Sequence, residues 1–245
     1  RRARMTTLRS AIFLAGGLVL TAIFGMLVPL SRAFGKDPPF AVARTYARLM
    51  LGWIEASLGI RSDVEGWENV PAGPAIVMAK HQSAWETIFL EARLPDQCWI
   101  VKRELLWLPF VGWGLLAIRC IAIDRSSGTT AREQVVQQGR QRLAEGHWVT
   151  IFPEGTRVAP GKRGRYGIGG ALLATRTGTP ILPIAHNAGE LWPRYAFRKR
   201  AGRVKVVVGP LIRTEGRDAI SVNQELERWI EDRMREISAK PHAGA

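Results

Sequence analysis

The chain has 245 residues, 47% of them apolar, and its 35 Lys and Arg against 21 Asp and Glu give a formal charge of +14. This length fits one catalytic domain with a short appendage, and the apolar fraction excludes a largely disordered chain. The charge predicts an anionic partner, either nucleic acid or an anionic membrane surface, with a merely basic soluble protein as the alternative. Cys98 and Cys120 have no CxxC spacing, so we expect buried, reduced thiols and no metal site.

The first predicted element is a membrane-embedded helical segment. Residues Ala11–Leu30 carry no charge over twenty positions, which suffices to cross a hydrocarbon core at about 1.5 Å per residue. The next segment, Phe40–Ile60, is apolar but contains Arg44, Arg48 and Glu55, a pattern typical of an amphipathic helix. We therefore expect residues 1–60 to anchor the chain and residues 61–245 to form the catalytic domain.

Two arrangements of this anchor fit the sequence. Ala11–Leu30 could span the membrane alone, or both segments could form a hairpin within one leaflet, turning at residues 35–39. Basic residues flank the first segment on both sides, which favours the hairpin slightly because neither flank then has to cross. A cleaved signal peptide fits less well, since no small-x-small cleavage site follows.

After Arg61 the sequence predicts an α/β fold, with a mixed, largely parallel sheet flanked by helices. Buried strands are expected at Ala75–Ala79, Cys98–Val101, Cys120–Ile123, Trp148–Phe152, Ile181–Ala185 and Val204–Val208. Helices are expected at Trp85–Arg93, Thr130–Glu145, Gly169–Arg176 and Val222–Ile237. The aromatic-rich run Leu105–Leu116 fits either the core or a hydrophobic groove that binds an acyl chain or contacts lipid.

His81 and Glu86 form the first candidate site, where a predicted strand ends and a helix begins. They can meet only if His81 lies in the turn and Glu86 in the first helical turn, because residues five apart on one helix point in different directions. Neutral histidine is a suitable general base near neutrality, and a carboxylate on its other nitrogen would fix the tautomer. The rival explanation is a capping box, in which Glu86 binds the Ser83 backbone N–H.

A second candidate site is the segment Phe152–Arg157, which follows another predicted strand. Pro153 ends that strand and Gly155 permits a tight turn, so Glu154 and Arg157 are expected beside the strand end. Arginine is a natural bidentate partner for a phosphate monoester. No G-x-S-x-G nucleophile elbow occurs, so direct attack by a substrate hydroxyl is the simplest chemistry.

Taken in order, the motifs resemble those of the glycerolipid acyltransferases, specifically the bacterial 1-acyl-sn-glycerol-3-phosphate acyltransferases. That family has a His-x4-Asp block, a Lys-x-Glu-Leu-x3-Pro-x2-Gly block ending in Ile-Asp-Arg, a Phe-Pro-Glu-Gly-Thr-Arg block and a Pro-containing apolar block. The corresponding segments begin here at His81, Lys102, Phe152 and Ile181, within about residues 70–190. Glu86 replaces the usual Asp, and Gly167 stands where a basic residue often follows, a role that Lys162, Arg163 or Arg165 could take.

The resemblance implies transfer of a fatty acyl group from coenzyme A or acyl carrier protein to the sn-2 hydroxyl of lysophosphatidic acid, forming phosphatidic acid. It implies that His81 deprotonates this hydroxyl and that Glu86 orients His81. Lys102 and Arg157 would bind the phosphate, and Glu154 would lie near the glycerol. Arg125 would add to the positive site or pair with Asp124. Neither a metal nor a bound cofactor is implied.

The same resemblance places the protein at the bacterial inner (cytoplasmic) membrane, with the site facing the cytoplasm. Anionic membrane lipids are expected partners of the basic stretch Arg194–Arg217, for which a solvated face is the alternative. No aromatic–basic RNA-binding signature occurs, so nucleic acid is not expected.

The rival functions are acylation of another lysolipid, such as lyso-ornithine lipid, and non-catalytic membrane binding. His147 and His186 are expected to be structural.

Overall fold

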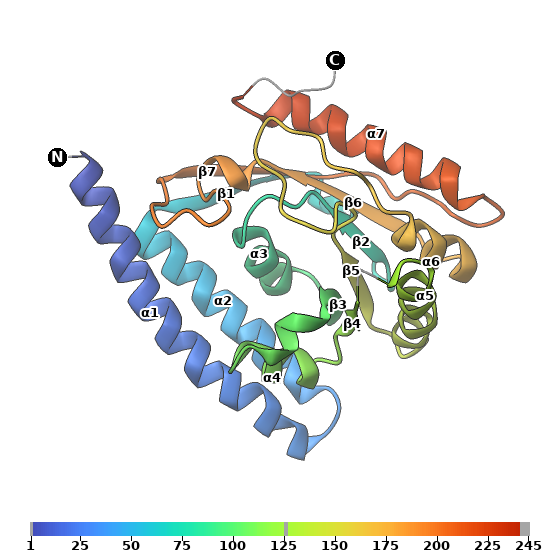
Figure 1. Cartoon of the computed structure of the whole chain (residues 1–245), viewed down its shortest axis with the longest axis horizontal. Helices are drawn as coiled ribbons and strands as arrows, with labels where there is room; N and C mark the ends of the chain where they lie inside the picture. Colours follow the sequence, from blue (N-terminus) through green and yellow to red (C-terminus); the bar gives the residue numbers. More distant parts are fainter. Residues whose placement is uncertain (1, 125–126, 241–245) are drawn as a thin grey trace.

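The computed structural model describes residues 2–124 and 127–240. Its first two helices fold back on each other (Figure 1), with α1 spanning Arg2–Leu30 and α2 spanning Pro38–Leu58. The chain turns through a 3-10 helix at Ser31–Phe34 and then Gly35, whose φ of 132° favours glycine. Trp53 Nε1 donates to the Phe13 carbonyl at 3.0 Å, which ties the two helices together.

Seven strands of the described chain form one sheet in the order β1-β7-β6-β2-β5-β3-β4. Neighbouring strands are parallel except for the antiparallel pair β6 and β7, so the predicted mixed, largely parallel sheet is confirmed. The strands are β1 Ile60–Glu65, β2 Ile76–Ala79, β3 Gln97–Lys102, β4 Ile121–Ile123, β5 Trp148–Ile151, β6 Ile181–His186 and β7 Gly202–Val208.

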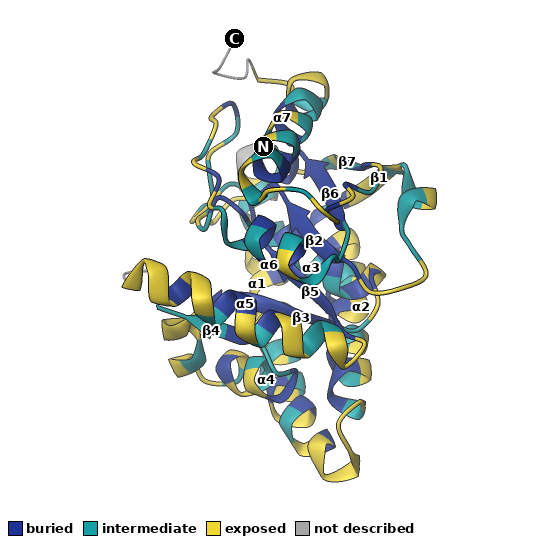
Figure 2. Ribbon diagram, turned by 90° about the vertical axis from the view of Figure 1, so that its right-hand side faces the viewer, coloured by how far each residue is buried: buried dark blue, intermediate teal, exposed yellow. Residues whose placement is uncertain are grey.

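Helices cover both faces of this sheet, and strand β2 shows why. Val77 and Ala79 point into the core shared with α2 and α3, whereas Ile76 and Met78 point into the core shared with α5, α6 and α7. Figure 1 shows these layers, and Figure 2 shows the central strands buried between them. The later helices are α3 Trp85–Arg93, α4 Val111–Ala117, α5 Thr129–Ala144, α6 Gly169–Thr177 and α7 Ala219–Ile237, with short 3-10 helices at Trp67–Asn69, Arg103–Trp107 and Ala188–Glu190.

The aromatic-rich run after β3 lies at the surface. Trp107 is 81% exposed and Leu116 57% exposed, so the core interpretation is wrong for most of Leu105–Leu116, although Leu115 packs against the core. This run contacts α1, where Gly25 lies against Phe110. Exposed apolar side chains also follow α1, at Leu8, Ile12, Leu18, Val19, Ile23, Met26, Leu27 and Leu30. The two segments together form an exposed apolar surface much larger than isolated apolar residues would give.

Candidate active site

Three of the predicted segments meet at one edge of the sheet. His81 follows β2, Phe152–Arg157 follows β5, and Lys102 ends β3. Strand β5 lies between β2 and β3, and all three run parallel, so their carboxyl ends share that edge. In open α/β sheets this is the edge where ligands usually bind.

The ring of His81 is paired with Glu86. Glu86 Oε1 lies 2.9 Å from His81 Nδ1 and also accepts from the backbone N–H groups of Gln82 (2.9 Å) and Ser83 (2.8 Å). The capping bond to Ser83 and the bond to His81 therefore occur together on one oxygen atom. With the Nδ1 proton directed at the carboxylate, Nε2 of His81 carries the free lone pair that a general base needs.

The segment after β5 holds His81 from the other side. The His81 N–H donates to Glu154 Oε2 at 2.9 Å, and the Val158 N–H donates to the His81 carbonyl at 2.8 Å. The His81 ring stacks on Phe152 with a centroid distance of 3.9 Å and an interplanar angle of 7°. The two sequence motifs thus build one site, and the second one fixes both the backbone and the ring plane of His81.

Glu154 has a different environment from the one expected next to glycerol. Its side chain is fully buried, and Oε1 accepts from Lys80 Nζ at 2.7 Å while Oε2 accepts from the His81 N–H. Burial raises the pKa of Glu154, although the Lys80 ammonium and the His81 N–H favour the charged form. Both oxygens are thus used within the protein, and the geometry makes Glu154 a neighbour that positions His81.

His186 lies behind Glu86 as a buried side chain. Its Nε2 donates to the Lys80 carbonyl at 2.7 Å, and its Nδ1 accepts from the Ala188 N–H at 3.3 Å. Burial lowers the pKa of His186. Burial also opposes the charge of Glu86, but nearby His186 and His81 and the Ser83 N–H outweigh it, so the pKa of Glu86 lies below its ordinary value. Glu86 is therefore an anion at neutral pH.

The basic candidates are less fixed than His81. Lys102 is exposed and pairs with Glu104 at 2.9 Å, and Arg157 is half-buried on the loop after β5. Arg125 lies outside the described residues. Arg163, a possible replacement for the missing basic residue at position 167, pairs with Glu227 at 2.7 Å, whereas Lys162 and Arg165 are exposed.

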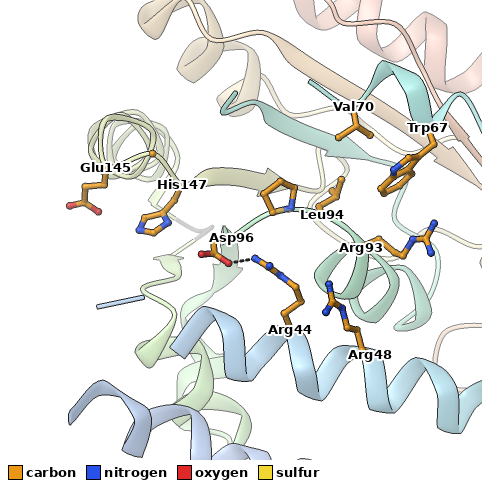
Figure 3. Close-up of a pocket in the computed structure, with 11 residues that line it drawn as sticks. Arg44, Arg48, Trp67, Val70, Arg93, Leu94, Asp96, Glu145 and His147 are labelled. Atoms are coloured by element: carbon orange, nitrogen blue, oxygen red, sulfur yellow. Dashed lines mark hydrogen bonds and ion pairs between the residues drawn. The ribbon is translucent and has the colours of Figure 1, made fainter. Parts of the chain in front are cut away.

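An open pocket lies at the opposite edge of the sheet (Figure 3). It is lined by residues that precede strands β3 and β5, among them Asp96 and His147, and by Arg44 and Arg48 of α2. Arg44 pairs with Asp96, and His147 stacks on Phe40 at 4.4 Å, which fits the structural role expected for His147. This pocket is therefore separate from the edge that carries His81.

Several residues at the site were not predicted from the sequence. Lys80, Tyr166 and Glu231 form a buried polar cluster beside Glu154. Phe152 belongs to the second predicted segment, but its stacking under His81 was not expected. The one local signal was Lys80 itself, a charged residue between an apolar strand and a candidate catalytic histidine. Across the described ranges 2–124 and 127–240, no group of three or more His, Cys, Asp or Glu side chains could hold a metal ion.

Comparisons with known proteins show the family of this chain. Residues 61–187 match the family model described as Acyltransferase. The chain is 43% identical over 200 residues to 1-acyl-sn-glycerol-3-phosphate acyltransferase of Pseudomonas aeruginosa, covering 80% of this chain and 78% of that protein. It is 33% identical over 172 residues to the human 1-acyl-sn-glycerol-3-phosphate acyltransferase alpha, covering 69% and 61% of the two chains.

The fold is that of a solved relative. The crystal structure of the 1-acyl-sn-glycerophosphate acyltransferase PlsC from Thermotoga maritima matches with a TM-score of 0.82 and 21% identity, covering 98% of this chain and 99% of that one. The likeness extends over α1 and α2 as well as the sheet, since it covers nearly the whole chain.

Proposed function

The chain belongs to the family of 1-acyl-sn-glycerol-3-phosphate acyltransferases, and from this premise we propose that it acylates the sn-2 hydroxyl of 1-acyl-sn-glycerol-3-phosphate to form phosphatidic acid. The observation that carries this proposal is the His81–Glu86 pair, which leaves Nε2 of His81 as a free base at the carboxyl edge of the sheet. The donor is a fatty acyl thioester of coenzyme A or acyl carrier protein.

The reaction follows from the protonation state of the pair. Nε2 of His81 takes the proton from the sn-2 hydroxyl as its oxygen attacks the thioester carbonyl carbon. The new C–O bond forms, the C–S bond breaks, and the departing sulfur receives the proton from His81. Glu86 stabilises the imidazolium between these two transfers, and no covalent acyl-enzyme is needed.

This function is tested by thiol release from palmitoyl-CoA by the purified protein in detergent, with and without 1-acyl-glycerol-3-phosphate. We expect release only when the acceptor is present. The same assay with palmitoyl-loaded acyl carrier protein identifies the preferred donor. No acceptor-dependent release with either donor, on this acceptor or on a panel of other lysolipids, would exclude the enzyme hypothesis.

We assign the acceptor phosphate to Arg157 and Lys102, with Arg125 as a third candidate. Arg157 follows β5, which pairs with β2, and Lys102 is the last residue of β3, which pairs with β5. A guanidinium and an ammonium together match a phosphate monoester. Glu154, whose carboxylate is buried, is assigned to holding His81 in place of contacting glycerol.

Replacing Arg157 with alanine is expected to raise the KM for 1-acyl-glycerol-3-phosphate about tenfold or more, because a charge-assisted contact is lost. The KM for acyl-CoA should stay within twofold, and turnover of 1-monoacylglycerol, which has no phosphate, should not change. The matched control is Arg163→Ala, whose partner is Glu227. Equal effects of Arg157→Ala on both acceptors would contradict the assignment.

We propose that residues 1–60 form a membrane-binding hairpin within one leaflet and that residues 61–245 form the catalytic part. Helix α1 has the length and composition of a membrane span. However, α1 packs along α2, and α2 packs on the rest of the fold through the Arg44–Asp96 pair and a bond from Arg48 Nε to the Ala92 carbonyl. If α1 crossed the membrane upright, α2 beside it would place Arg44, Arg48 and their partners in the hydrocarbon, which is costly. We place the hairpin in the inner membrane of a bacterium, with the site on the cytoplasmic side, where acyl thioesters occur.

Leu18→Glu on α1 is expected to weaken binding to phosphatidylglycerol-containing vesicles about tenfold or more. The reason is that a leucine side chain transferred from water into the membrane contributes about 1.5–3 kcal/mol to binding. The matched control is Ile220→Glu on α7, since Leu18 is 62% and Ile220 61% exposed. Vesicle co-sedimentation measures both variants. Equal binding by the two variants would show that the exposed face of α1 does not enter the membrane.

A further inference from the structure

We propose that Glu231, on the C-terminal helix α7, is a positioning residue for His81 and acts through Lys80 and Glu154. This inference rests on the proposed function, in which His81 is the base. It assigns to α7, which lies outside the segment matched by the family model, a positioning role in the acyl-transfer site.

The connection consists of short, buried contacts. Lys80 Nζ donates to Glu231 Oε1 at 2.8 Å and to Glu154 Oε1 at 2.7 Å, and the other Glu154 oxygen accepts from the His81 N–H at 2.9 Å. The side chains of Lys80 and Glu154 are 0% exposed and that of Glu231 is 6% exposed. Only two side chains therefore separate Glu231 from the backbone of His81.

Glu231 is itself held in a fixed position. The Tyr166 hydroxyl donates to Glu231 Oε1 at 2.7 Å, and burial together with Glu154 and Glu231 raises the pKa of Tyr166, which keeps it a donor. The adjacent Ile230 is fully buried in the core between the sheet and helices α5, α6 and α7. This packing fixes the position of α7, and with it that of Glu231, relative to the sheet. Gly164 lies close to Glu154, since a Cβ at position 164 would lie 2.7 Å from Glu154 Oε1.

The charges of Lys80, Glu154 and Glu231 depend on one another, because the one ammonium contacts both carboxylates. A buried ammonium requires an anionic partner, and Lys80 has two. Removal of Lys80 would leave Glu154 and Glu231 as buried carboxylates without their shared cation, so at least one would take up a proton or move. If Glu154 is the carboxylate that takes up a proton or moves, the acceptor of the His81 N–H changes. Displacement of a reacting group by about 1 Å can cost 10²-fold in rate.

The first test compares Glu231→Leu with Glu227→Leu, one turn earlier on α7 and paired with the exposed Arg163. We expect Glu231→Leu to lower kcat about tenfold, with the KM for both substrates within twofold. Glu231→Gln keeps an oxygen that can accept from Lys80 and Tyr166 and should recover part of the loss. Glu227→Leu should stay within twofold. The same kcat in the Glu231 and Glu227 variants overturns the proposal.

The second test uses Lys80→Met alone and combined with Glu231→Leu. We expect the double variant to turn over faster than Lys80→Met, because the second carboxylate no longer repels Glu154. A double variant that is slower than both single variants overturns the proposal. If the wild type shows no acceptor-dependent thiol release, the proposed function fails. The cluster is then tested separately by the unfolding free energies of the wild type, Lys80→Met, Glu231→Leu and the double variant. Additive losses of stability for Lys80 and Glu231 would then show that the two are not coupled.

Discussion

His81→Ala is expected to lower kcat for acceptor-dependent thiol release about 10³-fold, because the group that we propose accepts the sn-2 proton is lost. The KM values should change little, since Nε2 acts on the hydroxyl as it becomes a nucleophile and contributes little to ground-state binding. Thiol release with saturating 1-acyl-glycerol-3-phosphate measures the effect.

The control for this substitution is His147→Gln. His147 is a buried, stacked histidine at the opposite edge of the sheet, so its replacement should leave kcat within about threefold. Vesicle binding by His81→Ala should equal that of the wild type, since the apolar face of α1 is unchanged. A His81→Ala variant that retains a tenth of the wild-type kcat would show that another group removes the proton.

Much of the sheet could be predicted from the sequence because its strands are buried on both faces. Such strands appear as continuous apolar runs, as in β2 and β6, and the expected ranges differ from the observed ones by only one or two residues. Strand β1, Ile60–Glu65, was not predicted, because it is an edge strand with the polar sequence IRSDVE and mostly exposed side chains. The apolar residues of this segment show no regular alternation, so its sequence cannot be distinguished from that of a loop.

The site was predictable only as far as its contacts are local. His81 and Glu86 are five positions apart, so the strand-to-helix turn and the helix start limit where they can meet. Lys80 and Glu231 are 151 positions apart, and on α7 a buried glutamate between Ile230 and Asp232 looks like one more polar residue of an amphipathic helix. The contact between Glu154 and Lys80 could not be predicted for the same reason, because Lys80 comes from another strand end.

The local pair also explains why capping and catalysis could not be separated from the sequence. One oxygen of Glu86 serves the turn and the ring, so the sequence Ser83-Ala84-Trp85-Glu86 satisfies both hypotheses with the same atoms. A helix cap is normally a stabilising device. Here it also holds the carboxylate 2.9 Å from His81 Nδ1, so the start of α3 belongs to the catalytic arrangement that we propose.

Glu86→Gln is expected to lower kcat about 10²- to 10³-fold, because the amide can still accept from the backbone but cannot stabilise the imidazolium. Glu86→Asp keeps the charge and should stay within about tenfold of the wild type, with the turn shifting to close the gap of one methylene. Glu91→Gln, on the same helix, is the control. Burial raises the pKa of Glu91 to about 7, so its neutral form is already populated near neutral pH.

The stability of Glu86→Gln should depend on pH in a direction that the charge of Glu86 fixes. The folded-state pKa of Glu86 is below its ordinary value of 4.5, so its ionised form contributes stability above that value and loses it as the pH falls through the folded-state pKa. The difference in unfolding free energy between wild type and Glu86→Gln should therefore be largest near neutrality and shrink below pH 4.5. A difference that is constant from pH 7 to acid would mean that Glu86 acts by shape and hydrogen bonding alone, and Glu86→Gln would then retain most of its kcat.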